Sequence, residues 1–206
     1  MRVGILFSGG KDSVFATFWA LTHGFEPVLV TVKPPEYSLM FHHPNIDQTK
    51  KQAKSLGLKQ VFVETTEENW RERLIEVFKE LKVEGIVAGA IASEYQRRRI
   101  DSIGEELQVP TYAPLWHKDL DDSLIKEMLE YFEIYVTAVS AEGLTADFLG
   151  EPLQKLKDAK IPNIHPFLEG GEGETFVANA PFFKKRINIK KWKKTWDGVR
   201  GIAELS

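Results

Sequence analysis

Residues 3–15, VGILFSGGKDSVF, constrain the fold more than any other stretch of the chain. The apolar run Val3–Phe7 has the length of one buried strand. It leads directly into Gly9 and Gly10, where the missing Cβ atoms allow the backbone to turn sharply. From Val14 onward, apolar residues recur at helical spacing. A strand, a glycine turn and a helix in this order predict an α/β fold with parallel strands.

Apolar runs and helical patterns continue to alternate through the first half of the chain. Strands are expected at Val3–Phe7, Pro27–Val32, Val61–Thr65, Gly85–Ala88 and Thr111–Ala113. Helices are expected at Asp12–His23, Asp47–Leu56, Glu68–Glu80 and Glu94–Val109. Right-handed crossovers then give a doubly wound, five-stranded parallel sheet with helices on both faces. In such a sheet, ligands bind at the carboxyl ends of the strands.

The pattern changes at about residue 120. A helix at Ser123–Phe132 and a strand at Ile134–Ser140 are followed by glycine-rich loops and a basic stretch. We therefore expect two domains, residues 1–120 and a smaller α+β domain at residues 121–206. The loop Lys33–Asn45, which contains His42 and His43, is long, and long loops in compact domains are usually functional or disordered.

Composition excludes several classes of protein. The chain is 43% hydrophobic and 28% charged, which is typical of a soluble globular protein. Its net charge of −3 gives no general attraction to nucleic acid. The basic stretch Lys184–Lys194 is read first as a solvated face, with docking to RNA as the alternative. There is no cysteine, which excludes thiolate chemistry. No apolar run is long enough to span a bilayer, so a cytoplasmic location is expected.

Residues 8–13, SGGKDS, which we call the phosphate loop, suit an anion. Backbone N–H groups at the glycines and the positive end of the following helix favour negative charge, and Lys11 adds a cation. Asp12 would repel a phosphate unless it holds a metal ion or faces away. The spacing differs from that of a Walker A loop. The alternative is a simple glycine turn between a core strand and a core helix.

Two further stretches carry chemistry. In GAIASEYQRRRID (residues 89–101), small residues at a strand end precede a charged helix. One or two of its arginines are expected to bind an anion, and the alternative is i,i+4 pairing of Arg97 with Asp101 and of Arg98 with Ser102. EGGEGET (residues 169–175), the acidic loop, would hold Mg²⁺, a cationic substrate or ammonium, and the alternative is a flexible surface loop. His42, His43, His117 and His165 lack metal-ligand spacing, and none is assigned a role.

The phosphate loop resembles the PP-loop of the N-type ATP pyrophosphatases, which cleave ATP to AMP and pyrophosphate. Together with GAIASEYQRRRID and EGGEGETFVANAPFFKKRI (residues 169–187), it resembles the diphthine–ammonia ligase family. The resemblance implies the related adenine nucleotide alpha hydrolase-like fold. It also implies that ATP, with Mg²⁺, adenylates the carboxylate of diphthine, a modified histidine of elongation factor 2, and that ammonia then attacks. The implied partners are elongation factor 2 and ammonium, with no stable nucleic-acid complex and no membrane; a homodimer is also considered.

The family's functional residues map onto this sequence by motif. The nucleotide is expected at Ser8, Gly9, Gly10, Lys11, Asp12, Ser13, Thr31, Val32 and Gly89. The acceptor substrate is expected at Tyr95, Gln96, Arg97, Glu169, Gly170, Gly171, Glu172, Glu174 and Thr175. Catalytic roles are expected for Lys11, Asp12, Glu172 and Glu174, with Asp12 as the metal ligand. The chain departs from the family at Leu168, where glycine is usual, and at Gly173, where an aromatic residue is usual.

Two other functions remain open from the sequence. A different PP-loop ligase would use the same ATP chemistry on a tRNA base or a small carboxylate. A sensor would bind ATP or AMP without turnover, but it would have no need of a second polar loop.

Overall fold

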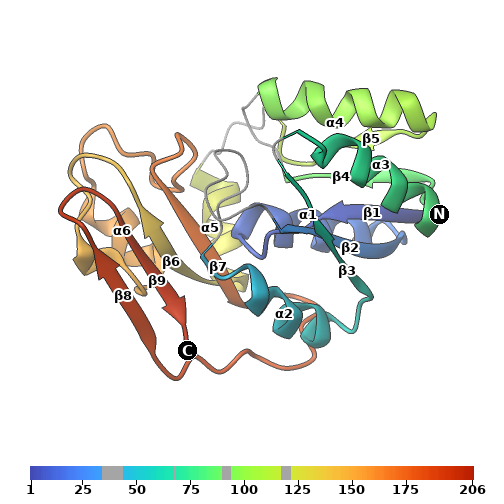
Figure 1. The fold of residues 1–206 in the computed structure, drawn as a ribbon. Helices are drawn as coiled ribbons and strands as arrows, with labels where there is room; N and C mark the ends of the chain where they lie inside the picture. Colours follow the sequence, from blue (N-terminus) through green and yellow to red (C-terminus); the bar gives the residue numbers. More distant parts are fainter. Residues whose placement is uncertain (34–43, 67, 90–93, 117–121) are drawn as a thin grey trace. The chain divides into compact units, whose positions relative to one another are not determined.

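The computed structural model describes residues 1–33, 44–66, 68–89, 94–116 and 122–206 (Figure 1). The loop with His42 and His43, the residue His117 and the segment 90–93 therefore lie outside the described residues. The chain forms two compact units. Unit 1 comprises residues 1–8, 12–42 and 56–118, and unit 2 comprises residues 9–11, 43–55 and 119–206. The two-domain boundary near residue 120 stays a prediction.

Unit 1 is built on a parallel sheet of five strands in the order β3-β2-β1-β4-β5. The strands are β1 (Arg2–Leu6), β2 (Glu26–Lys33), β3 (Gln60–Glu64), β4 (Gly85–Val87) and β5 (Thr111–Tyr112). Each lies within two residues of its expected position. Chain order reverses between β1 and β4, as the doubly wound prediction requires, and the predicted fold class is confirmed.

Three helices of the described chain pack on this sheet: α1 (Lys11–Thr22), α3 (Trp70–Leu81) and α4 (Glu94–Leu107). In Figure 1, α3 and α4 lie together on one side of the sheet. Their buried residues Leu74, Phe78 and Ile103 form one core cluster with strand residues such as Val30 and Ile86. The helical spacing of these apolar residues is what buries one stripe of each helix.

Unit 2 contains an antiparallel sheet in the order β7-β6-β9-β8. Its strands are β6 (Glu133–Val139), β7 (Gly173–Asn179), β8 (Trp192–Trp196) and β9 (Gly201–Leu205). Its helices are η1 (Ile46–Gln48), α2 (Thr49–Leu56, of which Leu56 belongs to unit 1), α5 (Asp122–Tyr131), η2 (Ala146–Phe148) and α6 (Leu153–Ala159). The helix predicted at Ser123–Phe132 and the strand predicted at Ile134–Ser140 are confirmed as α5 and β6, whereas β8, β9 and α6 were not predicted.

Residues 44–55 join unit 2 through side-chain hydrogen bonds to β9. The Asn45 amide donates to the Ala203 carbonyl oxygen at 2.8 Å and accepts from the Leu205 N–H at 2.7 Å. Gln48 Nε2 donates to the Leu205 carbonyl oxygen at 3.0 Å. No helix in the described part of the chain is long and apolar enough to cross a membrane.

Candidate active site

The phosphate loop forms where β1 ends and α1 begins. Gly9 has a φ of +81°, a left-handed conformation that glycine adopts without steric cost. A Cβ at this position would lie 2.2 Å from Gln52 Oε1, so the space beside Gly9 is also filled. The Gly9 carbonyl oxygen accepts from Gln52 Nε2 at 2.8 Å and from the Val177 N–H at 3.2 Å. Gly9 is thus tied to α2 and β7 within unit 2.

Lys11 connects the phosphate loop to the acidic loop. Its Nζ lies 2.5 Å from Glu169 Oε1, and its backbone N–H donates to Thr175 Oγ1 at 3.1 Å. The Lys11 side chain is 4% exposed and that of Glu169 is 14% exposed, so this ion pair is largely removed from water. The Phe167 ring centroid lies 6.0 Å from Lys11 Nζ. These contacts bring together two loops that are far apart in the sequence.

The carboxylate of Glu172 binds the backbone of its own loop. Its oxygens accept from the Gly170 N–H at 2.7 Å and from the His165 N–H at 3.0 Å. The Ser140 N–H in turn donates to the Glu172 carbonyl oxygen at 2.7 Å. The acidic loop is therefore shaped by defined hydrogen bonds.

His165 lies at the base of this loop. Its Nδ1 accepts from the Phe167 N–H at 3.2 Å, which requires the neutral ring with its proton on Nε2. Burial lowers the pKa of His165, and Lys11 lowers it further, while Glu172 acts in the opposite direction. The residue is thus held neutral by its surroundings, a role that sequence spacing did not reveal.

The two departures from the family pattern both lie at positions where the backbone favours glycine. Leu168 has a φ of +58°, which is a backbone conformation that favours glycine. The residue is nevertheless a leucine, and it is only 5% exposed. Gly173 begins β7, where a Cβ would lie 2.3 Å from the Ala138 carbonyl oxygen on β6. Close approach of the two strands at a register shift thus requires glycine at 173.

The expected nucleotide residues of unit 1 fall into two groups. Ser8 Oγ and Ser13 Oγ lie 3.3 Å apart beside Asp12 at the start of α1. A Cβ on Gly89 would lie 2.5 Å from the Asp12 backbone, so the glycine allows the end of β4 to approach α1 closely. Thr31 is fully buried, and its hydroxyl donates to the Phe7 carbonyl oxygen at 2.8 Å. A ligand at β2 would therefore meet the backbone near Thr31 rather than this hydroxyl.

The start of α4 exposes two of its three expected substrate residues. Tyr95 is 57% exposed, Gln96 is also exposed, and the Arg99 guanidinium stacks on the Tyr95 ring at 3.3 Å from its centroid. Arg97 Nε pairs with Asp101 Oδ2 at 2.8 Å, as the i,i+4 alternative predicts. Arg98 pairs with Glu94 at 2.8 Å and not with Ser102. Arg97 is thus held by its own helix.

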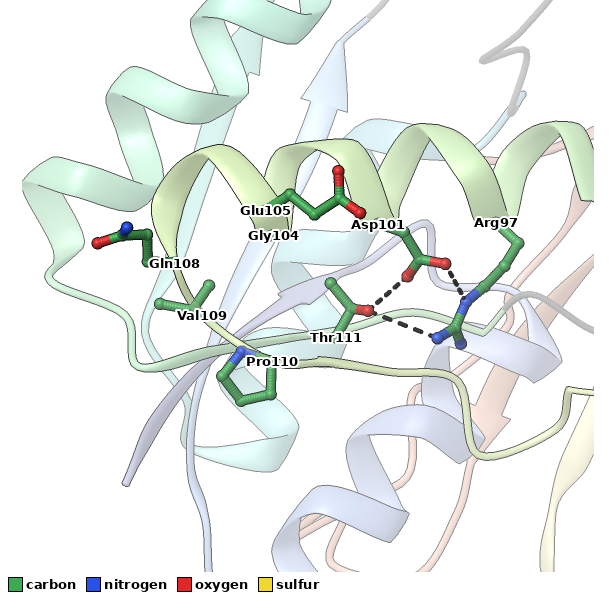
Figure 2. Close-up of a pocket in the computed structure, with 8 residues that line it drawn as sticks. All are labelled: Arg97, Asp101, Gly104, Glu105, Gln108, Val109, Pro110 and Thr111. Atoms are coloured by element: carbon green, nitrogen blue, oxygen red, sulfur yellow. Dashed lines mark hydrogen bonds and ion pairs between the residues drawn. The ribbon is translucent and has the colours of Figure 1, made fainter.

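Figure 2 shows the Arg97–Asp101 pair beside Thr111 in a cavity of about 400 Å³ along α4 and the start of β5. Thr111 Oγ1 donates to Asp101 Oδ1 at 2.5 Å and lies 3.5 Å from Arg97 Nη2. Gly104 and Val109 are also in the lining. Among the residues that the structure describes, Arg97 is the one expected site residue that lines this cavity.

The donors in the phosphate loop suit a metal ion that arrives with a nucleotide. Mg²⁺ is usually bound by one or two carboxylates together with substrate phosphates. Asp12 and the hydroxyls of Ser8 and Ser13 offer oxygen ligands at one end of α1. Within residues that the structure describes, no group of three or more His, Asp or Glu side chains could hold a metal ion without a substrate.

The basic stretch at residues 184–194 is mostly exposed, in agreement with the solvated-face interpretation. Arg186 is paired with Glu133 through two hydrogen bonds, one of them 2.6 Å from Nε to Oε2. Trp192 packs against Tyr135 and Phe176 in the core of unit 2. One aromatic residue of the stretch therefore serves folding.

Sequence reasoning missed three residues that build the site: Gln52, His165 and Phe167. Gln52 was detectable in principle because Thr49, Gln52 and Ser55 place polar side chains at three-residue intervals on the buried face of α2. Such a polar stripe indicates hydrogen bonding to another segment. The partner, the carbonyl oxygens of Gly9 and Val177, is 43 and 125 residues away and left no local signal.

Comparison with known proteins identifies the family. The family model of the diphthamide synthase N-terminal domain matches residues 1–111, and that of the C-terminal domain matches residues 121–206. Human diphthine–ammonia ligase is 32% identical over 92% of this chain and 83% of its own length. The mouse protein of that name is 30% identical over 100% of this chain and 89% of its own length.

Among solved structures, a predicted subunit of tRNA methyltransferase from Methanocaldococcus jannaschii is 19% identical. It covers 91% of this chain and 100% of its own, with a TM-score of 0.49, a likeness that carries no functional argument. The assignment instead follows from the family models, which together span nearly the whole chain, and from relatives at about 30% identity. The chain belongs to the diphthamide synthase family.

Proposed function

We propose that this protein is an ATP-dependent amide ligase that converts the diphthine carboxylate to the amide of diphthamide. A carboxylate oxygen attacks the α-phosphorus of ATP, the bond between the α- and β-phosphates breaks, and pyrophosphate leaves. Ammonia then attacks the acyl carbon, the bond to AMP breaks, and AMP leaves with the carboxylate oxygen. Ammonium must lose one proton to become the nucleophile and a second on forming the amide. The protein supplies positioning, charge neutralisation and exclusion of water.

The observation that carries this proposal is the direct bonding of the phosphate loop to the acidic loop. Lys11 reaches Glu169 with its ammonium and Thr175 with its backbone N–H. A site that activates a carboxylate with ATP needs a phosphate-binding group next to groups that handle a second substrate. The Lys11 contacts support such a juxtaposition, and a nucleotide sensor would not need it.

We assign the ATP phosphates to the backbone of Gly9 and Gly10, to the Lys11 ammonium and to the hydroxyls of Ser8 and Ser13. Lys11 would neutralise the charge that develops on the departing pyrophosphate. The adenosine moiety is assigned to the backbone near Thr31 and Val32 and to Gly89. Asp12 would hold Mg²⁺, which supplies Lewis-acid stabilisation of the phosphates when bound.

We assign the acceptor to two groups of residues. Tyr95, Gln96 and Arg97 form the first, and the exposure of Tyr95 and Gln96 supports contact with a large substrate. The acidic loop forms the second, with Glu174 as the proposed acceptor of a proton from the attacking nitrogen. Gly170, Gly171 and Glu172 shape that loop, because the Glu172 carboxylate is already bonded to backbone N–H groups.

The proposed acceptor is elongation factor 2 carrying diphthine, and the proposed nitrogen source is free ammonium. A cytoplasmic location and a homodimer are further expectations of the same proposal.

The test compares Lys11→Met with a matched control, Lys50→Met. Lys50 also forms an ion pair, with Asp47, but its side chain is 60% exposed. With Mg-ATP, ammonium and diphthine-bearing elongation factor 2, the wild-type protein should release AMP and pyrophosphate. Lys11→Met should lower kcat by about 100-fold or more, the usual effect of removing a group that stabilises transition-state charge. Lys50→Met should match the wild type, and equal activity of both variants would contradict the assignment of Lys11.

A further inference from the structure

We propose that the position of the Lys11 ammonium against Glu169 is the binding site of the ammonium substrate. On this proposal, binding of Mg-ATP draws Lys11 to the phosphates, and an ammonium ion takes its place beside the Glu169 carboxylate and the Phe167 ring. The inference rests on the proposed function, because it requires ATP at the phosphate loop. It adds the location of the nitrogen donor and an order of binding.

The first argument is that the structure already holds an ammonium group at this position. Lys11 Nζ lies 2.5 Å from Glu169 Oε1 and 6.0 Å from the centroid of the Phe167 ring. A carboxylate and an aromatic face are two kinds of group that bind an ammonium cation. The side chain of Lys11 ends in a primary ammonium, which is the closest chemical analogue of the free ion that a protein can offer.

The second argument is the cost of removing the cation from a shielded carboxylate. The Glu169 side chain is only 14% exposed, and Phe167 beside it is 1% exposed. Removing one partner of a buried ion pair is strongly unfavourable, because the remaining charge is poorly solvated. If Lys11 turns to the phosphates of ATP, Glu169 is stabilised by taking up a proton or another cation. An ammonium ion, which has the same chemistry as the lysine head group, is the best replacement for Lys11 beside the Glu169 carboxylate.

The third argument is that the backbone around the pair can stay in place during the exchange. The Lys11 N–H is bonded to Thr175 Oγ1, and the Gly9 carbonyl oxygen to Gln52 and Val177, so the loop is anchored without its ammonium. The Glu172 bonds to Gly170 and His165 likewise hold the acidic loop without Lys11. The exchange therefore requires a movement of the Lys11 side chain, which is long and flexible.

The exchange makes the two ligands thermodynamically coupled. If ATP opens the ammonium site, then ammonium must increase the affinity for ATP by the same factor that ATP increases the affinity for ammonium. Such couplings are typically about 5- to 150-fold. This reciprocity can be measured by binding alone, without any acceptor and without turnover.

The experiment is calorimetric titration of a Mg-ATP analogue with a non-cleavable bridge between the α- and β-phosphates. Each titration is run in ammonium chloride and in sodium chloride at equal ionic strength. We expect the wild-type protein to bind the analogue about 5-fold or more tightly in ammonium. Glu169→Gln should lose this difference and bind the analogue at least as tightly as the wild type in sodium, because the Glu169 carboxylate no longer competes with the phosphates for Lys11. Glu151→Gln, which removes a carboxylate from an exposed pair with Lys155, should behave as the wild type.

Phe167→Leu is a second variant that keeps apolar bulk and removes the ring. Its ammonium effect should fall about 2- to 5-fold, the usual contribution of one cation–π contact. Equal wild-type affinity in the two salts would overturn the proposal, as would a full ammonium effect in a folded Glu169→Gln protein. An analogue that binds in neither salt would refute the ATP step of the proposed function, and this inference with it. Binding without an ammonium effect would refute the inference alone.

Discussion

Substitution of Gly9 by alanine tests whether the phosphate loop is as tightly built as its contacts indicate. The new Cβ would lie 2.2 Å from Gln52 Oε1 and 2.9 Å from Thr49 Cγ2. Gln52 has no exposed surface, and its Nε2 donates to the carbonyl oxygens of Gly9 and Val177 at 2.8 Å each. The amide cannot move aside without breaking these bonds, so the added methyl group must be accommodated by strain.

The expected cost has two parts. An alanine at a φ of +81° costs about 1–2 kcal/mol relative to glycine, because the left-handed region is crowded for a residue with a Cβ. Displacing Gln52 adds about 1–3 kcal/mol, since its two hydrogen bonds contribute about 0.5–1.5 kcal/mol each. We therefore expect Gly9→Ala to lower the free energy of unfolding by about 2–5 kcal/mol.

Gly171 provides a matched control, because its φ is also +81° and no atom lies within 4 Å of the point that a Cβ would occupy. Gly171→Ala should cost only the backbone part, about 1–2 kcal/mol. The measurements are urea unfolding and hydrogen exchange at the Val177 N–H, which reports local opening at the Gly9 carbonyl. Equal destabilisation by the two substitutions would mean that Gln52 adds nothing to the cost at Gly9. Exchange of the Val177 N–H at the wild-type rate in Gly9→Ala would likewise contradict the prediction.

Three further predictions concern stability. The Arg186 hydrogen bonds lower the pKa of Glu133, so Arg186→Ala should lower the free energy of unfolding by at most about 1 kcal/mol at neutral pH. This difference from the wild type should vanish as the pH falls through the folded-state pKa of Glu133. Urea unfolding measured against pH tests the prediction, and a difference that stays constant with pH would contradict it. Burial lowers the pKa of His165, so the wild-type protein should lose stability as the pH falls from about 6.5 through the folded-state pKa, and His165→Gln should lack this loss in thermal unfolding curves. Leu168→Gly relieves the strain of a φ of +58° but leaves a cavity in place of the buried side chain. We expect it to lower the free energy of unfolding by a net ~1–2 kcal/mol. A more stable variant would mean that the backbone strain outweighs the burial of the side chain.

The parallel sheet was predictable because its signal is local. Each strand of unit 1 is a short apolar run, and each is separated from the next by a helical pattern or a turn. Strand β8 was not predictable in the same way. Its sequence, WKKTW, belongs to a basic stretch, its residues are mostly exposed, and in the described part of the chain β8 is the edge strand beside β9. Exposed lysines on an edge strand protect the edge from aggregation and hide it from a hydrophobicity pattern.

The candidate site was predictable as a set of motifs but not as an arrangement. The chemistry of SGGKDS and EGGEGET is visible in the residue types themselves. That Lys11 pairs with Glu169 is not, because the two residues are 158 positions apart and Glu172 and Glu174 offer equally suitable carboxylates. For Glu172 the backbone decides, because its carboxylate accepts from the N–H groups of Gly170 and His165.

We propose that the chain forms an amide on diphthine with nitrogen from ammonium. The most direct test of this proposal is mass spectrometry of diphthine-bearing elongation factor 2 after incubation with the protein, Mg-ATP and ammonium enriched in heavy nitrogen. We expect that a hydroxyl is replaced by a heavy-nitrogen amino group at the modified histidine, with AMP and pyrophosphate released in equal amounts. Release of AMP and pyrophosphate with no heavy nitrogen on the factor would contradict it.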